Sequence, residues 1–361
     1  MSYYINENVH TIFIMLGFSC NFKCKYCMQH EFKTINSVTY NKDILKFIEK
    51  YADIRKSKDE DLSIVFFGGE PLLFLDEIKS IVYGLKHISN ITYSMITNGS
   101  LIDDSNISFL NDNNIFLTIS WDGRTSKDSR NVDIFETNKE NIFKLKRFAV
   151  SGVLNAYNSP KTLLDDISLL DEEYRVRYNT DEHIGFIIDN LYKLENNCEE
   201  VFNIDFERYR TEIEDLTSKF IYHPEECSYA EFVYMSNIVN TIKQYNDDIE
   251  TKQFSQCMNG INVLNLDLEG NLYLCHNNKN KRLGDIYSSC ENYINSYIEL
   301  NEVPNFFKEY CVDCSVRFCC DGGCMLVSAD ERLKFLCKQK HMIYEPVIDG
   351  LINFKQEMDR V

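Results

Sequence analysis

Short apolar runs alternate with longer amphipathic stretches through the first half of the chain. The apolar runs predict strands at residues 11–17, 62–68, 92–97, 115–121, 148–154 and 183–189. Strands that alternate with helices form βαβ units on a parallel sheet. Six such strands predict an α/β fold, a partial (β/α)6 barrel resembling part of a TIM barrel. In such barrels the chemistry lies at the C-terminal ends of the strands.

The pattern changes twice in the second half. Residues 195–255 carry charges with Leu, Ile, Phe and Tyr at helical spacing, so we expect linking helices there. From residue 256 onward nine cysteines fall within the stretch 257–337, and residues 264–274 predict a hairpin. We therefore divide the chain into a barrel at 1–194, a helical linker region at 195–255 and a cysteine-rich domain at 256–361.

Composition limits the class of protein. The 361 residues are 44% hydrophobic, enough to bury a full core, and no apolar run reaches the roughly 18 residues that span a bilayer. The N-terminus lacks the pattern of a signal peptide, so we expect a cytoplasmic protein without membrane contact. The fourteen cysteines then indicate metal binding or catalysis more than disulfides. A net charge of −18 argues against a nucleic-acid partner.

A cysteine triplet directly follows the first apolar run. Cys20, Cys24 and Cys27 have the spacing C-x3-C-x2-C, which supplies three thiolates and no fourth. A four-iron cluster held by three cysteines keeps one iron open for chemistry, whereas a fully ligated cluster mainly moves electrons. The alternative is a zinc knuckle with a distant fourth ligand such as His30. The triplet favours an enzyme.

This loop, with Tyr26 just before the third cysteine, resembles the cluster loop of the radical S-adenosylmethionine (SAM) enzymes. The resemblance implies a [4Fe-4S] cluster whose open iron binds SAM, with Tyr26 near the cofactor. One-electron reduction then splits SAM to methionine and a 5′-deoxyadenosyl radical that takes a hydrogen atom from the substrate. It also implies a reducing partner such as flavodoxin or ferredoxin.

A Gly-Gly-Glu-Pro element, with Gly68, Gly69 and Glu70, follows the second predicted strand. Glycines let a backbone approach a ligand closely, and the proline ends the strand, leaving carbonyls available. In the radical SAM family this element holds the amino group of SAM, although alone it would suit a simple turn. A Thr-Asn-Gly turn at residues 97–99 also fits the family pattern.

Ser120 opens a Ser-Trp-Asp-Gly element after the fourth predicted strand. It resembles the family element whose serine contacts SAM, followed by an arginine that reaches the SAM carboxylate. The usual Asp-x-x-Arg spacing is not kept, so Arg130 is the expected contact and Arg124 its competitor.

The C-terminal cysteines resemble the seven-cysteine SPASM extension of radical SAM enzymes that modify peptides and proteins. The resemblance implies two auxiliary four-iron clusters, and hence three clusters in all. Cys257, Cys275 and Cys324 would bind the first auxiliary cluster, and Cys311, Cys314, Cys320 and Cys337 would bind the second. The first lacks a fourth ligand, which leaves an open site or a role for Cys227, Cys290 or Cys319. A zinc ribbon is the alternative for this region.

The residue after the hairpin cysteine separates branches of the family. Anaerobic sulfatase-maturating enzymes carry an aspartate base there, and this chain has His276. A Cys-His pair looks more like maturases of ribosomally made peptides (RiPPs), although the histidine is equally compatible with a structural role. We expect a radical SAM oxidoreductase that forms a thioether or carbon-carbon crosslink in a precursor peptide. The alternatives are a sulfatase maturase and an iron-sulfur carrier or sensor without SAM chemistry.

Leader recognition in many peptide maturases uses an N-terminal winged-helix domain. Only about ten residues precede the first predicted strand here. We therefore expect leader binding, if used, to need a separate protein or the predicted helical linker.

Overall fold

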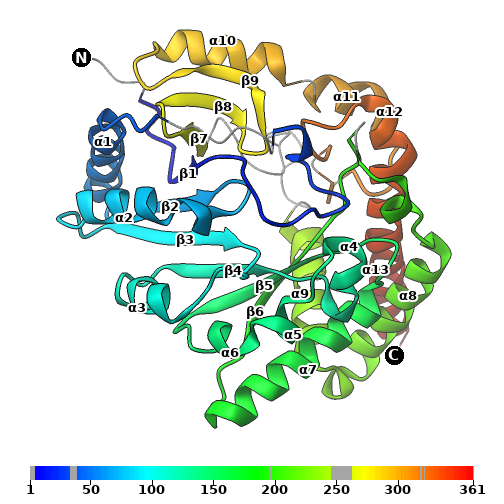
Figure 1. Ribbon diagram of the computed structural model, residues 1–361. Coiled ribbons are helices and arrows are strands. Elements are labelled where there is room, and N and C mark those ends of the chain that lie inside the picture. Colours follow the sequence, from blue (N-terminus) through cyan, green and yellow to red (C-terminus); the bar gives the residue numbers. More distant parts are fainter. Residues whose placement is uncertain are drawn as a thin grey trace. The chain divides into compact units, whose positions relative to one another are not determined.

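The computed structural model describes residues 5–32, 39–194, 197–244, 262–301, 303–317, 319–320 and 322–360. They form two compact units, traced in Figure 1. Unit 1 comprises residues 1–120, 134–150 and 257–302, and unit 2 comprises residues 121–133, 151–256 and 303–361.

Unit 1 is built on parallel strands. These are β1 (Thr11–Met15), β2 (Leu62–Phe67), β3 (Ile91–Thr97) and β4 (Phe116–Ser120), with the first residues of β5 (Phe148–Val153) next to β4. Strand β1 pairs with β2 from Thr11 opposite Ser63 to Met15 opposite Phe67. Because the strands are parallel, their C-terminal ends lie at one edge, where the loops with the predicted cofactor residues begin.

Helices connect these strands. Unit 1 contains α1 (Asp43–Ser57), α2 (Leu75–Gly84), α3 (Asp104–Asp112), α5 (Ile134–Thr137), α6 (Lys139–Ile142) and α10 (Cys290–Leu300), with short 3-10 turns at His30–Phe32 and Pro71–Phe74. Helix α1 buries Ile44, Phe47, Ile48 and Tyr51, which recur at the spacing of one helical face. Helix α3 starts at a capping box in which Asp103 and Asn106 satisfy each other's backbone N–H groups.

A hairpin from the cysteine-rich part of the chain extends the sheet of unit 1. Strand β7 (Val263–Asp267) pairs in parallel with β1, and β8 (Asn271–Cys275) and β9 (Asn278–Asp285) follow as antiparallel neighbours (Figure 1). Gly270 makes the tight turn between β7 and β8 at a φ of +92°, which favours glycine. The hairpin places Cys275 at the C-terminal end of β8.

Unit 2 combines the last residues of β5 with β6 (Gly185–Asp189) and most of the longer helices. These are α4 (Ser126–Arg130), α7 (Pro160–Tyr178), α8 (Phe206–Tyr222), α9 (Tyr229–Gln244), α11 (Val303–Tyr310), α12 (Ala329–Glu331) and α13 (Cys337–Met358), with 3-10 turns at Gly123–Thr125, Glu199–Phe202 and Pro224–Glu226. Helix α13 packs on α8 and α9 (Figure 1). A π-helical turn, Arg332–Leu336, leads directly into α13.

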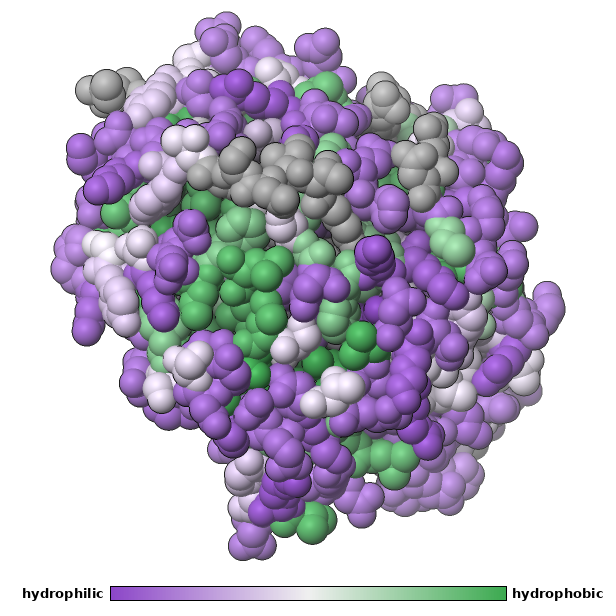
Figure 2. Space-filling view, viewed as in Figure 1, coloured by the Kyte–Doolittle hydropathy of each residue, from purple (hydrophilic) through white to green (hydrophobic). Residues whose placement is uncertain are grey.

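The observed fold confirms the predicted α/β class, with all six predicted strands in place as β1 to β6. The predicted hairpin is also present, while β9 was not predicted. The region predicted as a helical linker contains α8 and α9, and the two domain boundaries remain predictions. Most of the face in Figure 2 is hydrophilic, with apolar residues gathered in its middle. No helix among the described residues is long and apolar enough to cross a membrane.

Candidate functional site

The cysteine triplet lies in the loop after β1, in unit 1. Cys20, Cys24 and Cys27 are half-buried, and the Cys27 amide donates to the Cys24 carbonyl at 3.2 Å. The Phe22 amide points at Cys20 Sγ at 3.4 Å. Tyr26, predicted beside the cofactor, is buried. Partial exposure keeps the thiols within reach of a cluster while the loop backbone is fixed by its own hydrogen bonds.

The Gly-Gly-Glu-Pro loop packs directly against the start of this cysteine loop. The Gly69 amide donates to Gly17 O and the Glu70 amide to Ser19 O, both at 2.8 Å. A Cβ on Gly68 would collide with Gly17 O, and a Cβ on Gly69 would lie 2.5 Å from Ser19 C. We predicted that these glycines admit a ligand; the structure gives them a second task, which is to admit the backbone of the cysteine loop.

Glu70 joins three loops of unit 1. Its buried carboxylate accepts hydrogen bonds from Thr97 Oγ1 at 2.6 Å, from the Asn98 amide at 2.8 Å and from the Leu72 amide at 3.0 Å. Burial raises the pKa of Glu70, and these hydrogen bonds counteract part of the rise. The side chain of Glu70, a residue of the predicted SAM loop, thus fixes the Thr-Asn-Gly turn against the loop after β2.

Asn98 extends this network to the cysteine loop, a contact that sequence reasoning missed. Its side-chain amide donates to Asn21 Oδ1 at 2.9 Å and lies 4.0 Å from Cys20 Sγ. The Thr-Asn-Gly motif was noted in the sequence, but nothing local indicated that its asparagine reaches a segment 77 residues away. The loops after β1, β2 and β3 therefore form one hydrogen-bonded assembly.

The Ser-Trp-Asp-Gly element follows β4. Ser120 is half-buried at the end of this strand in unit 1, while the remainder of the element belongs to unit 2. There, Asp122 is completely buried and accepts hydrogen bonds from Ser129 Oγ at 2.6 Å and from the Val153 amide at 2.9 Å. Its carboxylate also pairs with the Arg130 guanidinium at 3.1 Å.

The two arginines of this segment have different surroundings. Arg130 is buried against Asp122, whereas the side chain of Arg124 is 71% exposed and pairs with Asp166. A buried, ion-paired guanidinium has a fixed orientation, which is what recognition of a carboxylate requires. Arg130 remains the predicted contact with the SAM carboxylate, and Arg124 its competitor.

Asp189, the last residue of β6, is an acidic group that sequence reasoning did not single out. Ser151 Oγ on β5 donates to Asp189 Oδ2 at 3.1 Å. The Asp189 side chain is accessible to solvent, yet nearby protein atoms displace part of its hydration and so raise its pKa. The hydrogen bond from Ser151 and the charges of Lys340 and Arg130 lower this pKa. A carboxylate at the C-terminal end of a barrel strand occupies a place typical of catalytic groups.

Four of the predicted auxiliary-cluster cysteines meet around one cavity of unit 2. Cys311, Cys314, Cys320 and Cys337 all line this cavity. Burial raises the pKa of Cys311 to about 12 and that of Cys337 to about 11, and the neighbouring sulfurs of the group add to both shifts. When thiols bind a metal cluster they lose their protons, and the positive metal ions offset the repulsion between the resulting thiolates. The donor set fits a four-cysteine cluster.

The neighbouring Cys319 has a different environment from Cys320. Its Sγ donates to Val316 O at 3.3 Å, and it is not found among the described residues that line the cavity. The adjacent side chains diverge, as the sequence led us to expect, and Cys320 is the one that faces the other three. Cys319 is buried in the core of this segment.

The predicted ligands of the first auxiliary cluster are only partly described. Cys257 lies outside the described residues, Cys275 is buried in unit 1 and Cys324 is buried in unit 2. Of the residues suggested as a fourth ligand, Cys227 is half-buried, and burial raises its pKa. The side chain of Cys290, at the start of α10, is outside the described part of the chain.

His276 is packed among aromatic rings. It stacks on Phe13 with ring centroids 4.3 Å apart, meets Phe67 edge-on at 4.5 Å, and its Nδ1 lies 3.2 Å from Asn265 Oδ1. Burial lowers the pKa of His276 to about 4, so the imidazole is neutral at pH 7. These contacts favour the structural role over that of an acid or base.

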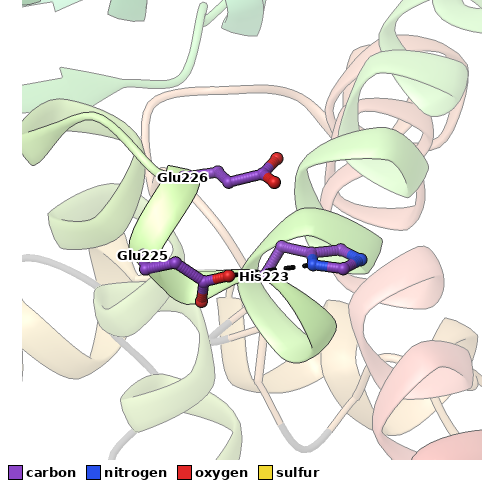
Figure 3. A group of neighbouring side chains, drawn as sticks. All are labelled: His223, Glu225 and Glu226. Atoms are coloured by element: carbon purple, nitrogen blue, oxygen red, sulfur yellow. Dashed lines mark ion pairs between the residues drawn. The ribbon is translucent and has the colours of Figure 1, made fainter.

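One exposed group of metal-binding side chains lies elsewhere in unit 2. His223, Glu225 and Glu226 come from a single turn after α8, and Figure 3 shows the ion pair between His223 and Glu225. All three are exposed, and such acidic turns are common on protein surfaces. We assign no site to them.

In this chain a Gly-Gly-Glu-Pro loop after β2 packs against a cysteine triplet after β1, at the end of a parallel sheet. This is the arrangement of a radical SAM enzyme. The family model of the radical SAM superfamily matches residues 14–167. Residues 14–167 therefore form a radical SAM domain, and such a domain implies SAM and a [4Fe-4S] cluster as cofactors.

Curated relatives match most of the chain. The cysteine-type anaerobic sulfatase-maturating enzyme of Clostridium perfringens (strain 13 / Type A) is 25% identical over 372 residues, covering 92% of this chain and 95% of the relative. The radical SAM cyclopropyl synthase TigE of Paramaledivibacter caminithermalis is 24% identical over 351 residues, covering 88% and 68%. Native anSMEcpe with bound AdoMet has a similar fold, with a TM-score of 0.69 and 19% identity over 96% of this chain and 99% of that one.

Proposed function

We propose that this enzyme oxidatively modifies a side chain of a peptide or protein, most simply by forming a thioether or carbon-carbon crosslink in a ribosomally made precursor. When bound, the SAM cluster and SAM supply the 5′-deoxyadenosyl radical that removes a hydrogen atom from the substrate. Cys20, Cys24 and Cys27 would hold this cluster. Backbone groups of residues 68–70 would bind SAM together with Ser120 and Arg130.

The observation that carries this proposal is the contact between the loops after β1 and β2. Two 2.8 Å backbone hydrogen bonds, donated by Gly69 and Glu70, join these loops, and a Cβ would not fit at Gly68 or Gly69. These contacts hold the cysteine loop at a fixed distance from the predicted SAM loop. A radical reaction needs the SAM carbon-sulfur bond fixed relative to iron and substrate. An electron carrier without SAM chemistry would have no use for this assembly.

The oxidation of the substrate requires that one electron and one proton leave after the hydrogen atom. In a thioether crosslink, the carbon radical bonds to a cysteine sulfur, the S–H proton is released and one electron leaves. The net change is the loss of two hydrogens. The auxiliary clusters would accept the electron, with Cys311, Cys314, Cys320 and Cys337 as ligands of the second cluster and Cys257, Cys275 and Cys324 of the first.

We propose Asp189 as the acceptor of the released proton. It lies at the C-terminal end of β6, Ser151 orients one carboxylate oxygen, and the raised pKa makes it a better base than an ordinary aspartate. This assignment supplies an acidic group that the residue after Cys275 does not provide in this chain. His276, which is neutral and packed between aromatic rings, would hold the C-terminal end of β8 in place.

The first test is SAM cleavage. Anaerobically reconstituted protein with reductant and SAM should release 5′-deoxyadenosine, and Cys24→Ala should abolish that release. Three clusters predict about twelve irons per chain. Cys320→Ala should lower the count toward about eight, whereas the matched Cys319→Ala should leave it near twelve. Iron without any 5′-deoxyadenosine would instead favour the carrier or sensor.

A sulfatase-type maturase is the second candidate, favoured by the match over 92% of the chain to a cysteine-type sulfatase-maturating enzyme. Oxidation of a cysteine to formylglycine in a sulfatase-derived peptide would identify this activity by the loss of sulfur. Loss of two hydrogens from a precursor peptide with sulfur retained would identify crosslinking. Offering both peptides to the same reconstituted sample separates the two activities.

A further inference from the structure

The Asn98 side chain is buried between two loops of the candidate site. Asn98 is 7% exposed, and its backbone amide donates to Glu70 Oε2 at 2.8 Å. This bond anchors the residue to the Gly-Gly-Glu-Pro loop, while its side chain lies against the segment that carries Cys20. A buried amide side chain is costly unless its polar atoms have hydrogen-bond partners, so those partners determine how the side chain is oriented.

The orientation of the Asn98 amide group follows from its contacts with Ser100. The backbone N–H of Ser100 can only donate, and it lies 2.9 Å from Asn98 Oδ1. Ser100 Oγ donates to the same oxygen at 2.6 Å. The Oδ1 atom is thus the acceptor, and the Nδ2 group faces the cysteine loop.

The Nδ2 group of Asn98 has two acceptors in the cysteine loop, one for each of its hydrogens. It donates to Asn21 Oδ1 at 2.9 Å and points at Cys20 Sγ, at a nitrogen–sulfur distance of 4.0 Å. Asn21 Nδ2 donates in turn to Ser100 Oγ at 2.8 Å, which closes a ring of hydrogen bonds. The ring fixes the residue that follows Cys20 and directs an N–H dipole at the sulfur.

A donor directed at a ligand sulfur affects how readily an iron-sulfur cluster accepts an electron. The electron makes the cluster and its cysteine sulfurs more negative, and hydrogen bonds to these sulfurs are among the factors that set the reduction potential. A donor stabilises the more negative state more strongly, and this effect is larger where burial excludes water. Because Asn98 is buried, its Nδ2 group favours reduction of a cluster on Cys20.

We propose that Asn98 is a positioning residue of the SAM cluster: it holds Cys20 in place through Asn21 and raises the reduction potential of the cluster through its N–H donor. This inference depends on the proposed function, because it requires a cluster on Cys20, Cys24 and Cys27. It gives a role in electron uptake to an asparagine whose sequence motif is a common turn. It also connects the cluster to the predicted SAM loop, to which the Asn98 backbone is bonded.

The test compares Asn98→Asp with Asn114→Asp in the reconstituted protein. Asn98→Asp replaces the donor with an anionic oxygen of similar shape, and the Asn21 amide can turn over to donate to it, which keeps the contact between the loops. Asn114 lies in an exposed turn before β4, at the opposite end of the parallel strands from the cysteine loop. Its φ of 49° suits aspartate as well as asparagine, so the control makes the same chemical change away from the cluster.

The measurement is a potentiometric titration monitored by EPR, following the cluster signal that changes when SAM is added. Asn98→Asp should weaken electron binding at least about tenfold, which is 59 mV for one electron. Asn114→Asp should change it by less than about a third of that, because water and salt screen an exposed charge. Asn98→Ala, which removes the donor without adding a charge, should lower the potential by less than Asn98→Asp. The potential is measured on loaded molecules, so incomplete loading of a variant does not obscure it.

The release of 5′-deoxyadenosine gives a second readout. In Asn98→Asp it should slow with a mild reductant and recover with a stronger one, such as titanium(III) citrate, because the cluster is present but harder to reduce. An unchanged or higher potential in both Asn98 variants, or slow release that the stronger reductant does not restore, would overturn the inference. Absence of a SAM-sensitive signal in the parent protein would instead overturn the cluster assignment under the proposed function.

Discussion

Gly69→Ala should separate the SAM loop from the cysteine loop. The new methyl group would lie 2.5 Å from Ser19 C, whereas carbon atoms normally approach to about 3.5 Å. The loops would have to move apart by about 1 Å, which breaks the two 2.8 Å hydrogen bonds donated by Gly69 and Glu70. Two hydrogen bonds at about 1 kcal/mol each, with an overpacking cost of about 1–3 kcal/mol, give a destabilisation of about 3–5 kcal/mol.

Gly84→Ala is the matched control. Its Cβ would lie 2.8 Å from the end of the Leu45 side chain, which can move, and alanine favours a helix over glycine by about 0.5–1 kcal/mol. We therefore expect nearly unchanged stability in this control. The assays are urea denaturation, iron content after reconstitution and the yield of 5′-deoxyadenosine. For Gly69→Ala, normal cluster loading with normal SAM cleavage would refute the reasoning.

Three further predictions concern single polar side chains. Asp122→Ala should lower the free energy of unfolding, measured in urea, by about 3–5 kcal/mol, because Arg130 would be buried without its carboxylate. Removal of the exposed Arg124 side chain should lower it by at most about 1 kcal/mol. Equal losses of stability in the two variants would contradict this. The rate of substrate oxidation should decline as pH falls through the raised pKa of Asp189, because this carboxylate must be deprotonated to accept a proton. An Asp189→Asn variant that keeps the same acidic limb of the pH–rate profile would exclude Asp189 as the proton acceptor. His276 has a pKa of about 4 in the fold and 6.5 in the unfolded chain, so it contributes stability above pH 6.5 that is lost as pH falls toward 4. His276→Phe should therefore make the urea midpoint less dependent on pH between these values, and the variant should retain activity. A tenfold loss of activity would indicate a catalytic histidine.

The strands and the cofactor loops could be predicted because their signals are local. An apolar run ended by glycine or proline specifies a buried strand and its turn wherever it lies in the chain. The spacing of Cys20, Cys24 and Cys27 likewise leaves room for only three thiolates in one loop. Each of these features depends on neighbouring residues, so the sequence was sufficient to identify them.

Tertiary structure decided which distant groups meet. It joined the hairpin β7–β8 to β1, placed Gly69 against the Ser19 carbonyl, and turned Cys320, rather than its neighbour, toward the cavity. No local pattern marks Asp189, since isolated acidic residues are common on protein surfaces. Its contact with Ser151 joins two strands that are far apart in the chain, and only packing of the complete fold determines such contacts.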